Sequence, residues 1–272
     1  MDMSEGSVDS VYGDWSRLQA RLAQADFEAG RLLVGLDFDG TLAEIVDRPA
    51  EAALAAETRR LLRLISRRPD TKIAILSGRA LEDVRRLVAM PEIYYAGNHG
   101  LEIHGPGIRW THPKAQDLGN DLGRALADDL REFPGAFVEY KRLGIALHYR
   151  KVPARHLGRL RDKVRARLAG LKERFRFLRG KKTFDLRPDI PWDKGHALET
   201  IRRTLSGGWM AVFIGDDATD EEAFQTIGPR ALTVRVGRVK TSAAQYVIPR
   251  RMLVDRLLET LARRSGASAR AR

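Results

Sequence analysis

The sequence DFDGT, at residues 37–41, places two carboxylates two positions apart directly after the apolar run Leu32–Leu36. If that run is a parallel strand, both carboxylates lie at its carboxyl end, where α/β sheets bind their ligands. One carboxylate could attack phosphorus while the other protonates the leaving oxygen and later takes a proton from water. Gly40 would let the backbone pass close to a phosphate, and Thr41 offers a hydroxyl and a backbone N–H. An ordinary acidic turn explains the motif equally well, whereas an EF-hand does not, because the glycine comes too early.

Two further segments offer groups that suit a bound phosphoryl group. Ser77 and Gly78 follow the apolar run Ile73–Leu76, so a hydroxyl and the N–H groups of a turn reach the same edge of the expected sheet. Lys194 begins a helical segment, from which its ammonium could screen phosphoryl oxygens and keep a nearby carboxylate ionised. Each segment alone also has an ordinary explanation, as a common turn and as a solvated helix end.

Four acids lie within six positions, from Asp216 to Glu221, after the apolar run Ala211–Ile214. Like charges this close repel one another, so a bound cation is one explanation of the cluster. A helix N-terminus, whose dipole favours acidic residues, is the other. Because the available ligands are oxygens with phosphate as a co-ligand, the cation favoured by this composition is Mg²⁺ rather than zinc or calcium.

The length and composition limit the kinds of protein that can carry these groups. With 272 residues, of which 43% are hydrophobic, we expect a globular chain with one large domain or a domain carrying an insertion. The absence of cysteine excludes disulfides, thiol nucleophiles and cysteine-held metals. No apolar stretch approaches the roughly 20 residues that span a bilayer, and the first residues lack a signal pattern. We therefore expect a cytoplasmic protein without a membrane partner.

Short apolar runs that alternate with helical segments predict an α/β fold. The runs Leu32–Leu36, Ile73–Leu76 and Ala211–Ile214 are apolar on both faces, which is typical of buried parallel strands. The sequence therefore predicts a Rossmann-like parallel sheet with helices on both sides. The helices expected between the strands are Ala52–Ser66, Leu81–Ala89 and Lys194–Leu205.

The pattern changes between about Trp110 and Phe184, where alternating strands replace the continuous apolar runs. Strands are expected at Ala136–Lys141 and Gly144–Tyr149, with helices near Ala115–Glu132 and Ala154–Arg174. Because the α/β pattern then returns, we expect a smaller α+β cap domain inserted into the sheet domain. The predicted organisation is a helical extension at 1–30 with a helix near 14–28, a core at 31–108 and 188–262, a cap at 109–187 and a flexible basic tail at 263–272.

The expected cap holds the whole surplus of positive charge. Residues 109–187 contain 21 Lys and Arg against 9 Asp and Glu, whereas the rest of the chain has 27 of each. Nucleic acid, membrane phosphates and a small anionic substrate all respond to such a field. The aromatic residues beside these cations are too sparse for a base-stacking surface, which disfavours nucleic acid.

Taken together, the motifs resemble those of the haloacid dehalogenase superfamily of Mg²⁺-dependent phosphotransferases. LDFDGTL at Leu36–Leu42, Ser77, Lys194 and GDDATD at Gly215–Asp220 match the four motifs in order, over residues 31–262. The resemblance implies that Asp37 is the nucleophile and Asp39 the general acid and base. It also implies that Ser77 and Lys194 bind phosphate, and that Asp37, the Asp39 carbonyl and Asp216 hold Mg²⁺, with Asp217 and Asp220 supporting the metal.

Further strings are similar to those of trehalose-6-phosphate phosphatases, in which an inserted cap closes over the sugar. They are SGR at 77–79, GNHGLEI at 97–103, VEYK at 138–141, HYR at 148–150, RPDIPWDKG at 187–195 and GDDATDEEAF at 215–224. The resemblance implies that Glu139 and Lys141 bind sugar hydroxyls. Asp185-Leu186-Arg187-Pro188 stands where the family has E-x-R/K-P, so the acid here is one methylene shorter.

A disaccharide phosphate needs carboxylates and amides for its hydroxyls and cations for its phosphate. His148 and Arg150 could serve this purpose or only mark the polar face of a strand, and His99 could equally be structural. The candidate substrate-binding residues are Arg79, Asn98, His99, Glu139, Lys141, His148, Arg150, Asp185 and Arg187.

We therefore expect a monomeric Mg²⁺-dependent phosphatase that hydrolyses trehalose 6-phosphate through an aspartyl-phosphate. A related sugar phosphatase, for example one acting on sucrose phosphate, is the nearer alternative. A basic nucleic-acid-binding protein is the remote one.

Overall fold

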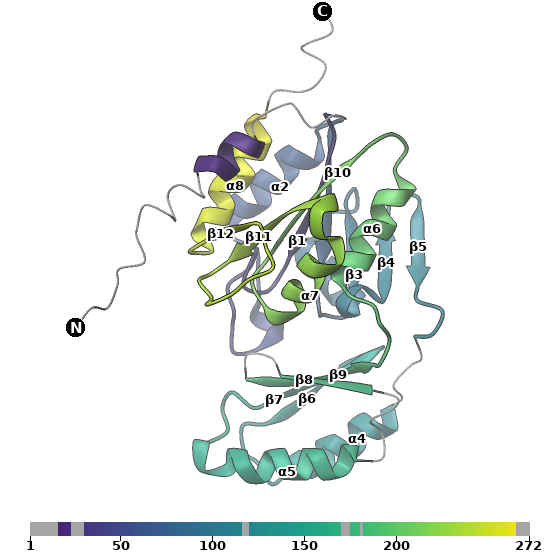
Figure 1. Ribbon diagram of the computed structural model, residues 1–272. Coiled ribbons are helices and arrows are strands. Elements are labelled where there is room, and N and C mark those ends of the chain that lie inside the picture. The colour runs from purple at the N-terminus through teal and green to yellow at the C-terminus, as the bar shows by residue number, and fades with distance from the viewer. Residues whose placement is uncertain (1–15, 23–29, 116–119, 170–174, 180–181, 265–272) are drawn as a thin grey trace, which may run out of the picture. The chain divides into compact units, whose positions relative to one another are not determined.

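The computed structural model describes residues 16–22, 30–115, 120–169, 175–179 and 182–264 (Figure 1). These residues form two compact units. The core unit runs to Trp110 and resumes at Trp192, and the cap unit is Thr111–Pro191. The sequence placed the second boundary at 187/188, but the last strand of the cap continues to Pro188 and pairs inside the cap sheet.

The core unit is built on an eight-stranded sheet of order β12-β11-β10-β1-β2-β3-β4-β5. Its strands from β12 to β3 are parallel, as predicted, whereas β4 is antiparallel to β3 and gives the sheet a mixed edge. The strands are β1 (Leu32–Asp37), β2 (Thr71–Leu76), β3 (Tyr94–Gly97), β4 (Glu102–Gly105), β5 (Ile108–Thr111), β10 (Met210–Gly215), β11 (Ala231–Val236) and β12 (Tyr246–Ile248).

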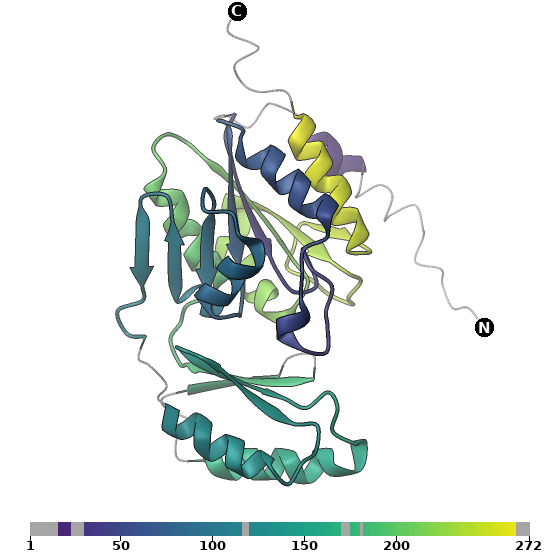
Figure 2. The same ribbon diagram turned by 180° about the vertical axis from the view of Figure 1, so that it is seen from behind.

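Helices cover both faces of this sheet (Figures 1 and 2). One face packs against α2 (Ala56–Ser66), α3 (Leu81–Val88), α8 (Met252–Arg263) and the short helix at 16–22. The other face packs against α6 (Lys194–Thr204) and α7 (Ala218–Ile227). Short 3₁₀ turns occur at Pro49–Glu51, Asn98–Gly100, Ala154–His156 and Gly228–Arg230.

The start of one core helix differs from the sequence prediction. The expected helix at Ala52–Ser66 begins only at Ala56, because Ala52 and Ala55 have extended backbone angles after the 3₁₀ turn. Of the helix expected near residues 14–28, residues 16–22 are helical and the remainder lies outside the described residues. Leu18 and Leu22 on this short helix are fully buried, so it belongs to the core unit.

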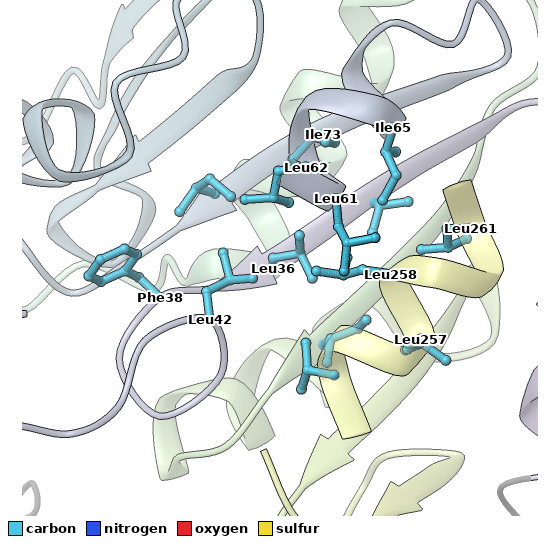
Figure 3. Close-up of a cluster of buried hydrophobic side chains, with 14 of the residues drawn as sticks. Leu36, Phe38, Leu42, Leu61, Leu62, Ile65, Ile73, Leu257, Leu258 and Leu261 are labelled. Atoms are coloured by element: carbon cyan, nitrogen blue, oxygen red, sulfur yellow. The ribbon is translucent and has the colours of Figure 1, made fainter. Parts of the chain in front are cut away.

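The larger hydrophobic cluster fixes the strand that carries the DFDGT motif (Figure 3). Leu36, Phe38 and Leu42 are fully buried and belong to the same cluster as the leucines of α2 and α8. Burying one such side chain contributes about 1.5–3 kcal/mol. Because apolar anchors alternate with Asp37 and Asp39, packing below the motif holds both carboxylates at the end of β1.

The cap unit has a four-stranded antiparallel sheet of order β6-β7-β9-β8. Its elements are α4 (Asn120–Leu130), β6 (Phe137–Lys141), β7 (Gly144–His148), α5 (Leu157–Leu168), β8 (Phe175–Arg179) and β9 (Thr183–Pro188). The helices α4 and α5 pack on one face of the sheet through Leu126, Leu130, Leu160 and Val164. The other face carries Glu139, Lys141, His148 and Asp185, as the pairing register and the alternation of side chains require.

Both predicted cap helices end earlier than expected, at Leu130 and at Leu168. The helix predicted at Ala115–Glu132 is described from Asn120 to Leu130, and residues 116–119 lie outside the described residues. The helix predicted at Ala154–Arg174 begins at Leu157 after a 3₁₀ turn and is described to Leu168.

Among the described residues, no helix has the length and apolar character needed to cross a bilayer.

Candidate active site

Three adjacent parallel strands bring the main candidate residues to one edge of the core sheet. Asp37 is the last residue of β1, Ser77 follows β2, and Asp216 follows β10. β1 lies between β2 and β10, so strands that follow β1 in the sequence are added to the sheet on both sides of it. This is the switch point at which open α/β sheets bind ligands. The structure therefore groups these three residues as the sequence predicted.

Lys194 lies in the middle of this group and is buried. Its Nζ donates to Asp37 Oδ1 at 2.7 Å and to Asp220 Oδ1 at 2.8 Å. Burial alone lowers the pKa of the Lys194 ammonium, but the carboxylates of Asp220 and Asp37 outweigh it and hold the pKa above its ordinary value. Lys194 is therefore a fixed positive charge beside the predicted nucleophile.

Asp193 positions Lys194 by capping helix α6. Its Oδ1 accepts from the N–H groups of Gly195 at 2.7 Å and His196 at 3.1 Å, and its Oδ2 accepts from Thr226 Oγ1 at 2.6 Å. An N-cap of this kind stabilises a helix by about 1 kcal/mol. Asp193 is not among the residues predicted from the sequence, although an aspartate directly before a helical segment is the usual signal for such a cap.

The acidic segment after β10 forms a capping box at the start of α7. Asp217 Oδ1 accepts from the N–H groups of Thr219 at 2.8 Å and Asp220 at 3.0 Å. Asp220 Oδ2 accepts in return from the N–H groups of Asp216 at 2.8 Å and Asp217 at 3.0 Å. A Cβ on Gly215 would lie 2.3 Å from Asp220 Cγ, so only glycine lets the Asp220 side chain turn back. The helix-capping explanation of these acids therefore holds for Asp217 and Asp220.

Capping does not account for the whole acidic cluster. Carboxylate oxygens of Asp37, Asp216 and Asp220 lie within 4.8 Å of one another, and all three residues are buried. Burial raises the pKa of the Asp37 carboxyl well above its ordinary value, and Lys194 offsets this only in part. Three buried carboxylates against one ammonium leave excess negative charge, which a divalent cation held by oxygen ligands would neutralise. The residues therefore fit a hard metal ion.

Asp220 is the least available of the three for direct contact with a metal. One of its oxygens accepts from Lys194 and the other accepts from two backbone N–H groups. Asp37 and Asp216 are the better candidates, with Asp220 as support.

Gly40 and Thr41 both approach Asp216. Gly40 has φ +94°, and a Cβ there would lie 2.3 Å from Asp216 Oδ2. The hydroxyl of Thr41, which is fully buried, donates to Asp216 Oδ1 at 3.3 Å. The sequence predicts that these two residues lie at a bound phosphate. In the structure they also position Asp216, because Gly40 leaves room for its side chain and Thr41 forms a hydrogen bond with it.

Asp39 is engaged by Arg79, which we expected to bind substrate. Arg79 donates through Nε to Asp39 Oδ2 and through Nη2 to Asp39 Oδ1, each at 2.7 Å. The backbone N–H of Arg79 also donates to Ser77 Oγ at 3.1 Å, and Ser77 is buried. Arg79 thus connects Asp39, the predicted general acid and base, to Ser77, which is predicted to bind phosphate.

Asn98 and His99 lie against the same loop in an unusual backbone conformation. Their φ angles are +50° and +57°, in the left-handed region that side chains disfavour. Their N–H groups donate to the carbonyls of Arg79 at 2.7 Å and Ser77 at 3.0 Å. The His99 ring packs so closely on Gly78 that a Cβ there would lie 2.6 Å from His99 Cε1. These contacts support the structural explanation of His99 and show why residue 78 is glycine.

Four of the predicted cap residues form one ion pair and one hydrogen bond on the sheet face opposite α4 and α5. Lys141 Nζ lies 2.9 Å from Asp185 Oδ1, and His148 Nε2 lies 2.7 Å from Glu139 Oε2. The His148 ring also stacks on Phe137, with 4.5 Å between ring centroids. Of the other two cap candidates, Arg187 is buried within β9, and Arg150 is exposed beyond the end of β7.

Acids of the neighbouring chain segments neutralise part of the basic helix α5. Arg159 and Lys163 both pair with Glu132, and Arg167 donates to Asp129 Oδ2 at 2.7 Å. These pairs lower the net charge that α5 presents, which weakens the nucleic-acid alternative.

Comparisons with known proteins identify the family of the chain. The family model for trehalose-phosphatase matches residues 35–249. A trehalose-phosphate phosphatase from Mycobacterium avium is 42% identical over 222 residues, which are 77% of this chain and 55% of that protein. A trehalose-phosphate phosphatase from Mycobacterium bovis is 33% identical, over 96% of this chain and 70% of its own length. The chain thus spans from about half to about two thirds of the length of these relatives.

A solved structure shares the fold. The C-terminal domain of Candida albicans trehalose-6-phosphate phosphatase superposes with a TM-score of 0.75 at 22% identity, covering 90% of this chain and 96% of that one. A haloacid dehalogenase-like hydrolase from Bacteroides thetaiotaomicron also superposes, with a TM-score of 0.60 at 16% identity. The predicted fold class is therefore confirmed.

Proposed function

Because the chain belongs to the trehalose-phosphatase family, we propose that it hydrolyses trehalose 6-phosphate to trehalose and inorganic phosphate. The observation that carries the proposal is the position of Asp37, which is buried at the switch point of the sheet. Asp37 accepts a hydrogen bond from Lys194, and a carboxylate oxygen of Asp216 lies within 4.8 Å of one of its own. A carboxylate fixed beside a buried ammonium is suited to attack a phosphate dianion, because the ammonium offsets the repulsion between the two anions.

In the first step, Asp37 Oδ attacks phosphorus in line with the sugar oxygen. The new O–P bond gives an aspartyl-phosphate, and the bond between phosphorus and the sugar oxygen breaks. Asp39 gives its proton to that oxygen, so trehalose leaves as a neutral alcohol. Lys194 stabilises the charge that spreads over the phosphoryl oxygens.

In the second step, Asp39 takes a proton from water as the water oxygen attacks phosphorus. The O–P bond to Asp37 breaks, inorganic phosphate leaves, and the carboxylate of Asp37 is restored. Ser77, Gly78 and Thr41 bind the phosphoryl oxygens in both steps. The position of Ser77 at the end of β2, next to β1, supports this role.

The metal that fits the acidic cluster is Mg²⁺. Asp37, Asp216 and the backbone carbonyl of Asp39 would hold it, with Asp217 and Asp220 in support. When bound, it supplies positive charge to the phosphoryl oxygens, as is usual in phosphoryl transfer.

For the sugar, we propose that Glu139 and Lys141 bind hydroxyl groups. A carboxylate accepts from hydroxyls and an ammonium donates to them, so the two types complement a polyol. The hydrogen bond of Glu139 with His148 and the ion pair of Lys141 with Asp185 support this role, because side chains fixed in advance lose less entropy on binding. Asn98, His99, Arg150 and Arg187 remain further candidates for substrate contacts.

Phosphate release from trehalose 6-phosphate by the purified chain with Mg²⁺ tests the proposal. Sucrose 6-phosphate, glucose 6-phosphate and p-nitrophenyl phosphate are measured beside it, and the highest kcat/KM is expected for trehalose 6-phosphate. Asp37→Asn should abolish release without changing the circular dichroism spectrum. Full turnover by that variant, or a clear preference for another sugar, contradicts the proposal.

A further inference from the structure

Arg79 is anchored independently of Asp39. Its Nη1 donates to the carbonyl oxygen of Pro49 at 2.8 Å and to Asp83 Oδ2 at 2.9 Å, while its guanidinium lies 5.4 Å from the centroid of the Phe38 ring. Its backbone carbonyl accepts from the N–H of Asn98. These contacts hold the guanidinium in one place whether or not Asp39 is bound to it.

The two partners differ in exposure. The side chain of Arg79 is 7% exposed, whereas that of Asp39 is 38% exposed. Moving a buried guanidinium away from its partners costs free energy, since it is left without hydrogen bonds. Asp39 is therefore the partner that can move, and Arg79 is the fixed reference.

Both oxygens of Asp39 accept from Arg79 in the observed arrangement. To give a proton to a leaving oxygen, one of them has to exchange a guanidinium bond for a contact with the substrate. The second bond then still sets the direction of the carboxyl group. A bidentate arginine suits this purpose because its two donors are parallel and lie at fixed spacing.

We infer that Arg79 is a positioning residue for Asp39, braced by Asp83, and not a direct contact for the sugar. The inference rests on the proposed function, since it assigns Asp39 the role of general acid. Arg79 makes no new bond during the reaction. It limits the carboxyl group of Asp39 to orientations from which the proton reaches the leaving oxygen.

The leaving group distinguishes this role from a purely structural one. The oxygen of a sugar alcohol needs a proton as it departs, whereas p-nitrophenolate departs without one. The constant to compare is kcat/KM, which covers the steps up to departure of the alcohol and leaves out the later attack by water. We expect Arg79→Met to lower kcat/KM for trehalose 6-phosphate by about 10- to 100-fold, the range expected for a misplaced acid. For p-nitrophenyl phosphate the decrease should be less than about 3-fold, because only the proton transfer is impaired.

Three variants complete the experiment. Arg79→Lys keeps the charge but not the paired donors and should be intermediate, and Asp83→Asn should show a smaller effect with the same substrate dependence. Arg86→Gln is the matched control, because the exposed Arg86 pairs with the other oxygen of Asp83 and should leave both constants unchanged. If Arg79→Met does not fold, the two milder variants carry the test.

The inference is overturned if the Arg79 and Asp83 variants lower kcat/KM equally for both substrates, or lower neither. An increased KM for trehalose 6-phosphate at unchanged kcat would instead assign Arg79 to sugar binding and also overturn it. Failure of the proposed function has a different signature, which is a wild-type protein that does not hydrolyse trehalose 6-phosphate.

Discussion

Lys194 Nζ donates to Asp37 Oδ1 across 157 positions of sequence, at 2.7 Å and in a buried environment. The pair joins the first residue of α6 to the last residue of β1. It therefore couples the packing of α6 on the sheet to the charge state of the predicted nucleophile.

Replacing Lys194 with Met should abolish phosphatase activity and destabilise the fold. The substitution leaves Asp37 and Asp220 buried without their ammonium, and breaking a buried ion pair costs about 3–5 kcal/mol. Urea unfolding measures the loss. Added Mg²⁺ should recover part of it, because the cation neutralises the same carboxylates. If, in the absence of Mg²⁺, the variant unfolds at the same urea concentration as the wild type, the ion pair does not stabilise the fold.

Replacing Gly40 with Ala should weaken binding of Mg²⁺. The new Cβ meets Asp216, whereas Gly107 has a similar positive φ of +74° with nothing within 4 Å, so Gly107→Ala is a matched control for backbone strain alone. We expect Gly107→Ala to cost about 1 kcal/mol, the usual cost of a strained φ, and Gly40→Ala to cost more. Isothermal titration with Mg²⁺ and thermal unfolding measure both effects. Equal results for the two variants would contradict the assigned contact.

Replacing Asp193 with Ala should lower both stability and kcat. The variant loses the cap of α6 and the bond from Thr226, at a cost of about 1–2 kcal/mol. Asp193→Asn keeps an acceptor oxygen and should recover most of the stability. If kcat falls while KM is unchanged, the cap positions Lys194; a loss of stability alone would limit Asp193 to a structural role.

Asp70 should contribute stability that depends on pH. Burial raises the pKa of its carboxyl, but hydrogen bonds from Arg68 outweigh this and the pKa is lowered from its ordinary value of 3.8. A lowered pKa in the folded state means that the stabilisation is fully present above the unfolded value and is lost as the pH falls through the folded value. The difference in unfolding free energy between wild type and Asp70→Asn should therefore be constant near pH 6 and shrink below about pH 4. A difference that does not change with pH would contradict this assignment.

Replacing Glu139 with Ala should reduce activity on trehalose 6-phosphate while slow release from p-nitrophenyl phosphate persists. The sugar loses an acceptor for its hydroxyls, whereas the aromatic ester has none to offer. Glu132→Ala is a suitable control, since Glu132 is a second cap glutamate whose partners are Arg159 and Lys163 on the helical side. Comparable effects of the two substitutions would argue against a sugar contact at Glu139.

The sequence predicted those parts of the site that depend on where strands end. Asp37, Ser77 and Asp216 each follow an apolar run, and parallel strands bring such positions together whatever the details of packing. The pairing of Arg79 with Asp39 was not predictable in this way, because it joins side chains 40 positions apart through the folded loop around Pro49. For this reason the sequence predicts substrate binding for Arg79 and does not reveal its pairing with Asp39.

The antiparallel edge of the core sheet was missed for a similar reason. Strand β4 has four residues, Glu102–Gly105, of which Ile103 is the one apolar side chain, so it shows no apolar run like that of β1. It follows β3 directly through the left-handed turn at Asn98–Gly100. Short edge strands owe their place to pairing with a neighbour, which a single segment of sequence does not reveal.

The rings of Trp110 and Trp192 pack with 5.0 Å between their centroids, and these two residues are the last of the core before Thr111 and the first after Pro191. The chain thus leaves and re-enters the core at neighbouring points, with the indole N–H of Trp192 tied to the carbonyl of Gly100. A linker of a few residues could therefore connect Trp110 to Trp192 in place of the intervening 81 residues, Thr111–Pro191. The two units are therefore separable along the chain: replacing Thr111–Pro191 would change the residues proposed to bind the sugar and keep those proposed to transfer the phosphoryl group.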